Sequence, residues 1–202
     1  MKDKLLQYMA KYTNLNEDDQ KAILEEIAVE TFSKGTNLAK QGYPINPTKC
    51  YFVLSGCIRQ YRIDSNGKEV TTNFYTEEQP ILLSNLLELD HTSKYSLTCV
   101  EDAVLVVGDI ESEEDMYEQY SELEKMTRRM MEIYLGEAQN DLTQFISSTP
   151  EERYKSIIQK RPNLVNRVPQ HQLASYLGMT PESLSRIKKR IHENNADKST
   201  PS

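Results

Sequence analysis

Hydrophobic and polar positions along the chain follow three successive patterns. Residues 4–30 place apolar side chains at helical spacing, interrupted by a polar stretch at 13–16, which predicts two short helices. Asn16 is followed by three acidic residues, as is typical of an N-cap and an acidic first turn, since negative charge is favoured at the positive end of a helix dipole. From Thr31 to Asp109, short alternating or apolar runs are separated by turn residues, which predicts an all-β sandwich or barrel.

The clearest β element covers residues 50–74. Asn66 and Gly67 separate two β-rich runs within it, and both residues tolerate the positive φ angles of a type I′ turn. We therefore expect a β-hairpin closed by this turn. A last pair of strands is predicted at residues 95–100 and 103–107.

The pattern then becomes helical from Ser112 to Phe145, with one Gly and no Pro. Apolar residues in the first half step by three and four positions, which is the spacing of a coiled-coil seam. We interpret these as dimerisation residues: Leu123, Met126, Met130 and Ile133. The alternative is that this helix packs on its own β domain. A second stripe is expected to contact the next domain, namely Leu135, Ala138, Leu142 and Phe145.

A domain boundary is predicted where this helix ends. Residues 147–152 resemble a hinge and a helix start, with Thr149 as N-cap and Pro150 at the first helical position. A short helix follows at 153–160 and stops at Arg161-Pro162. The expected domains are a sensor at 1–111, a dimerisation helix at 112–147 and a helical domain at 148–202.

Residues 168–191 carry the pattern of a helix-turn-helix. A first helix, about 170–177, is followed by the turn 178–180, where Gly178 can adopt the left-handed conformation that ends a helix. Thr180 caps a second helix, whose inward residues are Leu184, Ile187 and Ile191. Ala174 is small at the point where two steeply crossing helices come closest, as a DNA-binding helix-turn-helix requires.

The outward face of the second helix is polar and basic. Arg can donate two hydrogen bonds to guanine, Glu can accept one from cytosine, and Lys can neutralise phosphates. The candidate DNA-binding residues are Gln170, Thr180, Glu182, Ser183, Ser185, Arg186, Lys188, Lys189 and Arg190. A helical hairpin with a solvated basic face is the alternative.

Composition and charge sharpen this picture. The 202 residues include 38% hydrophobic ones, which excludes a disordered or fibrous chain. No apolar run approaches the length of a membrane span or a signal peptide, and three scattered Cys argue against a disulfide framework, so a cytoplasmic protein is expected. The net charge of -7 argues against DNA, but residues 151–202 hold ten Lys and Arg against five acids. That segment is +5 and the remainder -12, which indicates two domains with different partners.

The chain resembles the Crp/Fnr family of bacterial transcription regulators. Residues 34–35, 51–56 and 64–70 look like the family's cyclic-nucleotide-binding β roll, and residues 112–145 look like its dimerising helix. The segment 182–186, Glu-Ser-Leu-Ser-Arg, resembles the Glu-x-x-Ser-Arg signature of the recognition helix, in which Glu and Arg contact bases. The resemblance implies an α+β protein with a jelly-roll (double-stranded β-helix) sensor domain, a long dimerisation helix and a C-terminal helix-turn-helix.

Two departures from the family pattern matter. Leu83, Ser84 and Asn85 stand where cyclic-nucleotide binders have Gly-Glu-Leu, and Lys94-Tyr95 stands where they have Arg-Ser or Arg-Thr. Lys does not reproduce the two-pronged phosphate contact of Arg. In the family's cyclic-nucleotide binders, a hydroxyl on the long helix contacts the purine, and the corresponding position here falls near Ile133-Tyr134. Usual control by cyclic AMP is therefore not expected, and the effector-binding residues remain unknown. In addition, the segment 193–202 is short and polar and is predicted to be turn-like. We therefore expect the C-terminal wing of the family to be reduced or absent.

The sequence thus predicts a homodimeric regulator that binds an inverted repeat in double-stranded DNA. RNA polymerase and an unidentified small-molecule effector are open candidates as further partners, and no membrane partner is expected. The alternative function is a ligand-binding or scaffold protein whose helix-turn-helix contacts other proteins. Nothing in the sequence indicates an enzyme, a cofactor or a metal site, and the cysteines are interpreted as ordinary β-roll residues.

Overall fold

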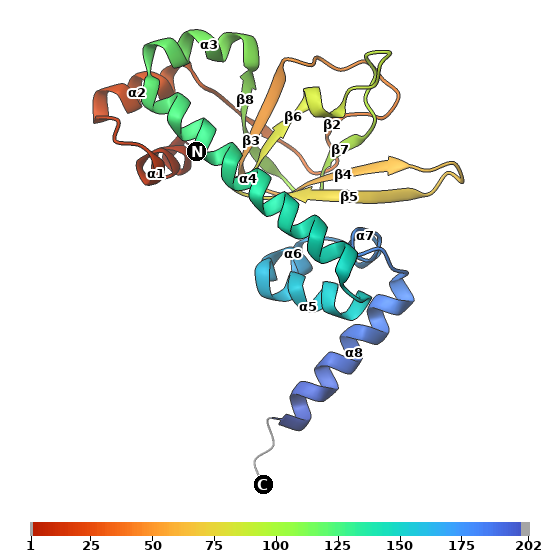
Figure 1. Cartoon of the computed structure of the whole chain (residues 1–202). Coiled ribbons are helices and arrows are strands. Elements are labelled where there is room, and N and C mark those ends of the chain that lie inside the picture. Colours follow the sequence, from red (N-terminus) through yellow and green to blue (C-terminus); the bar gives the residue numbers. More distant parts are fainter. Residues whose placement is uncertain (1, 199–202) are drawn as a thin grey trace.

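The computed structural model describes residues 2–198, which form an N-terminal helical pair, a β roll, a long helix and a C-terminal helical domain (Figure 1). The helical pair comprises α1 (Lys2–Tyr12) and α2 (Glu17–Glu26). The side chain of Asn16 accepts a hydrogen bond from the Asp19 amide, so the predicted N-cap is confirmed.

The β roll consists of two four-stranded antiparallel sheets. One has the order β1-β8-β3-β6 and the other β2-β7-β4-β5, which is the jelly-roll topology expected from the sequence. The strands are β1 (Ala28–Phe32), β2 (Asn37–Ala39), β3 (Lys49–Ser55), β4 (Ile58–Ile63), β5 (Glu69–Tyr75), β6 (Pro80–Leu82), β7 (Ser96–Cys99) and β8 (Ala103–Asp109). The last two strands exist where predicted, but they pair in different sheets rather than with each other.

The predicted hairpin joins β4 to β5, but its turn is not type I′. A type I′ turn needs a positive φ at both central residues. Gly67 has φ +76, but the φ of Asn66 is not positive. The amide of Asp64 donates to the carbonyl of Lys68, and the Asp64 carboxylate accepts from the Asn66 and Lys68 amides. The aspartate therefore stabilises a wider loop in which only the glycine is left-handed.

The long helix predicted from 112 to 145 is two helices. These are α3 (Ile110–Gln119) and α4 (Ser121–Ser147), and between them Tyr120 leaves the helical conformation at φ -125 and ψ 79. Tyr120 is buried in one apolar cluster with residues of α1, α2 and α4. The bend lets both helices present apolar side chains to the N-terminal pair.

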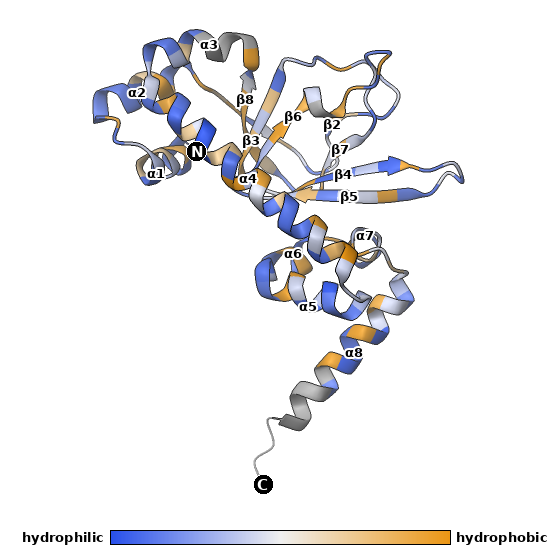
Figure 2. Cartoon of the chain, viewed as in Figure 1, coloured by the Kyte–Doolittle hydropathy of each residue, from blue (hydrophilic) through white to orange (hydrophobic). Residues whose placement is uncertain are grey.

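Two of the four residues predicted for the dimer seam are covered within the chain itself. Leu123 and Met126 are only 6% and 7% exposed, because they lie in the cluster formed with α1 and α2, and Met130 packs at its edge. Of the four proposed seam residues, only Ile133 counts among the exposed large apolar side chains. The exposed apolar positions lie instead in the second half of α4, which extends past the roll to the C-terminal domain (Figures 1 and 2).

The C-terminal domain is entirely helical over its described residues. It contains α5 (Pro150–Lys160), α6 (Pro162–Arg167), α7 (Gln170–Tyr176) and α8 (Pro181–Lys198). Thr149 and Glu152 form a capping box at the start of α5, as the sequence predicts for the N-cap. The turn-like conformation expected from residue 193 is wrong, because α8 continues to Lys198; residues 199–202 lie outside the described part. No strand follows Asp109 within residues 110–198.

None of the helices within residues 2–198 combines the length and the hydropathy of a membrane-spanning segment.

Replacement of Leu123 tests the corrected packing. Leu123→Ala should lower the free energy of unfolding by about 2–5 kcal/mol, since it leaves a cavity among α1, α2 and α4. Urea denaturation measures this. Leu89→Ala, which truncates the same side chain at a fully exposed position, is the matched control and should change stability little. Equal effects of the two substitutions would contradict the assignment of Leu123 to the interior.

Candidate nucleic-acid interface

The turn of the helix-turn-helix is built as its sequence predicts. Gly178 has φ +69, and the amide of Met179 donates to the carbonyl of Ala174, which closes the end of α7. The Thr180 hydroxyl accepts from the Ser183 amide at 3.2 Å and caps α8. Ala174 is fully buried between the helices. These local bonds define the angle at which α8 leaves the domain.

The two faces of α8 divide as predicted. Leu184 and Ile187 are buried in the core of the C-terminal domain, and Ile191 packs at its edge. Most of the candidate DNA-binding residues are exposed, namely Gln170, Thr180, Glu182, Ser185, Arg186, Lys189 and Arg190, while Ser183 and Lys188 are half-buried. The structure thus brings seven of the nine predicted residues onto one helix, with Thr180 at its cap and Gln170 on α7.

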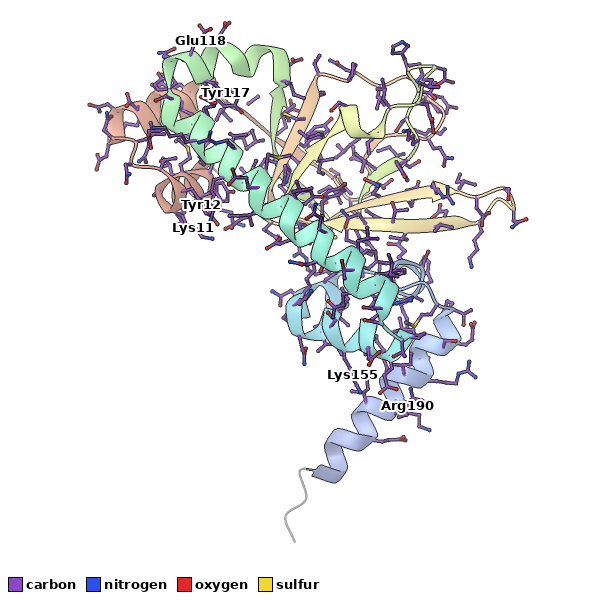
Figure 3. The ribbon with its side chains drawn as sticks, in the orientation of Figure 1. Lys11, Tyr12, Tyr117, Glu118, Lys155 and Arg190 are labelled. Carbon is purple, nitrogen blue, oxygen red and sulfur yellow. The ribbon has the colours of Figure 1, made fainter. Side chains whose placement is uncertain are left out.

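The four predicted cations of α8 already contact groups within the domain, and Lys189 pairs with Glu193 at 3.8 Å. Arg190 forms an ion pair with Glu151 of α5, and Lys155 pairs with the same carboxylate at 2.7 Å. Figure 3 shows Lys155 and Arg190 close together where α5 meets α8. The ammonium group of Lys188 lies 6.0 Å from the ring centroid of Tyr154. Within the described residues, Arg186 donates one hydrogen bond, to the Ser183 hydroxyl at 3.4 Å, so most of its donors remain available. Hydrogen bonds from the Glu182 amide and from Thr180, together with the charge of Arg186, lower the pKa of Glu182.

An ion-pair network joins the helical domain to the β roll. Arg167 at the end of α6 donates two hydrogen bonds to Glu77 at 2.8 and 2.9 Å, and its Nε donates to Glu101 at 3.0 Å. Burial alone would raise the pKa of Glu77, but hydrogen bonds from Arg167 and the Gly56 amide hold it below its usual value. Apart from the opposite net charges of the two halves, no pattern in the sequence predicts this pairing.

The first helix of the helix-turn-helix also packs directly on the roll. The Ser175 hydroxyl accepts from the Thr71 amide of β5 at 2.9 Å, and Tyr176 meets Phe74 edge-on at 5.4 Å between ring centroids. Arg161 donates to the carbonyl of Phe74 at 2.8 Å. Phe74 is fully buried in the same cluster as the helix-turn-helix core. Strand β5 therefore forms the surface of the roll against which the helical domain packs.

The interior of the roll is filled by large side chains. Tyr51, Tyr75 and Leu83 are buried in its core, and Tyr134 of α4 packs against them. The Tyr75 hydroxyl donates to Gln60 at 2.8 Å, and burial raises the Tyr75 pKa.

The positions aligned with the family's nucleotide contacts differ in their burial. Leu83 belongs to the core, whereas Ser84 and Lys94 are exposed; the side chain of Asn85 lies outside the described part of the structure. No cation from these positions enters the roll.

The three cysteines are buried, and no disulfide joins them. Burial raises the pKa of Cys57 to about 12 and that of Cys99 to about 11. Both thiols stay protonated at neutral pH and are poor nucleophiles.

Comparisons with known proteins agree with this architecture. Residues 29–120 match the family of the cyclic nucleotide-binding domain. FixK2 from Bradyrhizobium japonicum is 17% identical, with a TM-score of 0.65 over 84% of this chain and 86% of that one. A CooA mutant from Carboxydothermus hydrogenoformans is 14% identical, with a TM-score of 0.65 over 85% and 79%. A regulator of the Crp/Fnr family from Eubacterium rectale is 16% identical, with a TM-score of 0.59 over 90% and 85%.

The chain has the Crp/Fnr fold. No curated protein matches it in sequence. The Crp/Fnr fold accounts for the order of the β roll, the long helix and the helix-turn-helix, which the sequence pattern and the resemblance had predicted.

Removal of the Arg167 side chain should weaken the contact between the helical domain and the β roll. Arg167→Ala should lower the free energy of unfolding by about 1–2 kcal/mol, less than for a fully buried charged hydrogen bond because Glu77 is 40% exposed. It should also increase the radius of gyration measured by X-ray scattering. Lys155→Ala, which breaks a pair inside the helical domain, is the control and should leave the radius unchanged.

The same contact has a predictable pH dependence. Since the pKa of Glu77 is lowered in the folded state, the stabilisation is complete above the ordinary glutamate pKa and is lost as the pH falls through the lowered value. The stability difference between wild type and Arg167→Ala should therefore shrink on acidification. A difference that does not change with pH would contradict the role of Glu77.

Proposed function

We propose that the protein is a DNA-binding transcription regulator that binds an inverted-repeat operator as a homodimer. The observation that carries this proposal is the exposed polar face of α8, supported by a well-capped helix-turn-helix within the Crp/Fnr fold. Two-fold symmetry would set the two recognition helices about 34 Å apart, one turn of DNA.

Within α8 the contacts suggest different roles for the charged residues. Glu182 and Arg186 are exposed in the first turns, where they would meet base edges in the major groove. Lys189 would neutralise phosphate. Arg190 shares Glu151 with Lys155, so a phosphate must compete with an existing ion pair for it. We therefore assign Arg190 a smaller part in DNA affinity than Arg186.

The corrected packing moves the proposed dimer surface along α4. Leu135, Leu142 and Ile146 are 59%, 61% and 74% exposed, and they are separated by seven and four residues, so they share one helix face. An exposed apolar stripe on a helix needs a covering partner. We propose that the same stripe of a second copy covers it, near the helical domain rather than at the N-terminal end of α4.

We further propose that cyclic AMP does not control this protein in the usual way. The packed tyrosines in the roll and the exposed position of Lys94 support this view. An effector, if the protein has one, would act by shifting the population of arrangements between the roll and the helical domain. Contact with RNA polymerase remains a prediction from the resemblance.

Arg186→Ala should reduce affinity for the cognate operator by about 1–3 kcal/mol and change affinity for random DNA little. Arg190→Ala, one helical turn further along, serves as the matched cation and should have the smaller effect on operator affinity. Fluorescence anisotropy with operator fragments, selected from genomic DNA by the purified protein, measures both. Equal losses on cognate and random DNA would contradict base contact by Arg186.

Salt titration separates the proposed function from that of a scaffold protein. DNA affinity should fall steeply as salt rises, because binding releases counterions from the phosphates. Binding only to proteins, with no salt-sensitive DNA complex, would favour the scaffold function.

Leu135→Glu should shift the protein from dimer to monomer in sedimentation equilibrium, since it places a charge in the apolar stripe. Asn140→Glu adds the same charge on the opposite side of α4 and should leave the dimer intact. A dimer that survives Leu135→Glu would rule out this stripe as the interface.

A further inference from the structure

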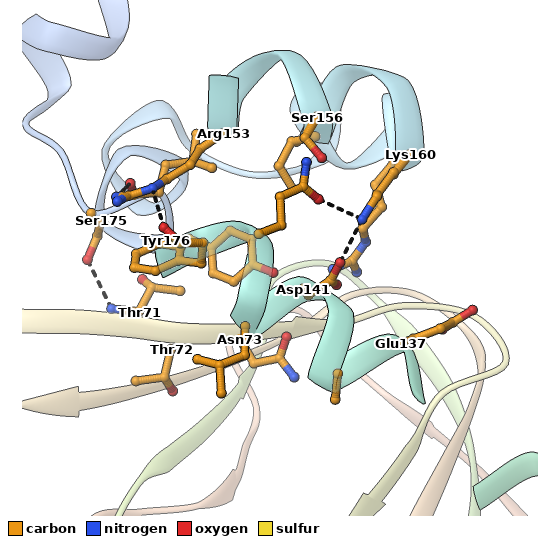
Figure 4. A pocket seen from close by; sticks show the side chains of 18 of the residues that line it. Thr71, Thr72, Asn73, Glu137, Asp141, Arg153, Ser156, Lys160, Ser175 and Tyr176 are labelled. Carbon is orange, nitrogen blue, oxygen red and sulfur yellow. Dashed lines mark hydrogen bonds and ion pairs between the residues drawn. The ribbon is translucent and has the colours of Figure 1, made fainter. Parts of the chain in front are cut away.

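A cavity of about 530 Å³ lies where β5, α4, α5 and α7 meet. Its volume is within the range of small-molecule sites, which occur preferentially between domains. Figure 4 shows its polar lining, with Thr72 and Asn73 from β5, Ser156 from α5 and Tyr176 from α7. The cavity lies outside the roll interior and is separate from the exposed face of α8.

Two arginines in the cavity wall, Arg153 and Arg161, donate hydrogen bonds to neutral acceptors. Arg153 donates to the carbonyls of Phe145 and Leu177, each at 3.1 Å. Arg161 donates to the carbonyl of Phe74 at 2.8 Å and to the Thr76 hydroxyl at 3.1 Å. Among the described residues, no carboxylate forms an ion pair with either guanidinium group.

The other charges of the lining largely cancel. Lys160 lies 2.9 Å from Asp141, a pair that Figure 4 shows. Lys160 also donates to the side chain of Gln144 at 2.8 Å. Glu137 also lines the cavity, so the wall as a whole carries a net charge of about +1. Positive charge without a carboxylate partner in a partly enclosed space attracts an anion, and a cavity of this size lies within roughly one Debye length, about 10 Å, of both arginines.

The remaining lining matches an organic rather than an inorganic anion. Tyr134 and Tyr176 supply aromatic surface, and Asn73 and Ser156 supply hydrogen-bonding groups. Burial raises the pKa of both tyrosines, so the phenols remain neutral donors at neutral pH. Glu137 disfavours a second negative charge in the ligand.

We propose that this interdomain cavity binds a small organic anion that carries one acidic group and an aromatic ring. Such a ligand would touch the roll through β5, the long helix through Tyr134 and the helical domain through α5 and α7. It would therefore stabilise the docked arrangement of the domains, because a ligand favours the state in which its contacts exist together. The consequence for operator binding rests on the proposed function, whereas binding to the cavity does not.

The test uses the full-length protein and benzoate as the probe, with benzyl alcohol as the neutral counterpart of similar shape. Saturable benzoate binding in the millimolar range is expected in isothermal titration calorimetry, with benzyl alcohol at least tenfold weaker. No saturable benzoate binding, or equal affinity for the two probes, would overturn the proposal.

Two variants locate the binding. Ser156→Phe fills the cavity without removing a charge and should weaken benzoate at least tenfold. Gln159→Phe adds the same ring at an exposed position on α5 and should bind benzoate like wild type. Glu137→Gln should strengthen binding by about two- to threefold, because it removes a like charge from the rim. Benzoate affinity unaffected by Ser156→Phe would place the ligand elsewhere and refute this site.

Anisotropy with operator DNA is measured separately, with and without benzoate. A protein that binds benzoate in the cavity but no DNA would refute the proposed function and leave the binding site standing. The reverse result would refute the cavity proposal alone.

Discussion

The docking of α7 and α6 against β5 and its neighbouring loops governs how this molecule presents its recognition helix. Arg167 is shared by Glu77 and Glu101, and the Ser175 hydroxyl and the ring of Tyr176 complete the contact. Charge, hydrogen bonding and apolar burial act at one surface, so the helical domain has a defined position relative to the roll. The direction in which α8 points follows from that position and from the turn at Gly178.

Local signals in the sequence predicted most elements of the fold. Asn16, Thr149 and Thr180 cap helices where expected, because a capping side chain bonds to an amide only two or three residues away. The outward residues of α8 were predicted for the same reason, since Leu184 and Ile187 define the buried face within one helix. Such relations involve neighbours in sequence and need no knowledge of the fold.

Errors arose where a distant segment decides the outcome. The spacing of Leu123 and Met126 is the same whether a second copy or α1 covers them, and only the tertiary structure shows that α1 and α2 do so. The helix breaks at Tyr120 because burial of its ring against those helices outweighs the helical pattern around it. The Arg167 contact and the interdomain cavity join residues about 90 positions apart, which no local periodicity reveals.

The junction between α4 and the helix-turn-helix is short and crowded. Only Ser148 and Thr149 separate α4 from α5, and a side chain at position 178 would lie 3.1 Å from both Phe145 and Arg153. The bare backbone of Gly178 lets the last turn of α4 lie directly against the turn between α7 and α8. A small rotation of α4 would thus displace α8 through direct contact rather than through a flexible linker. The glycine that ends α7 therefore also couples the movement of the long helix to that of α8.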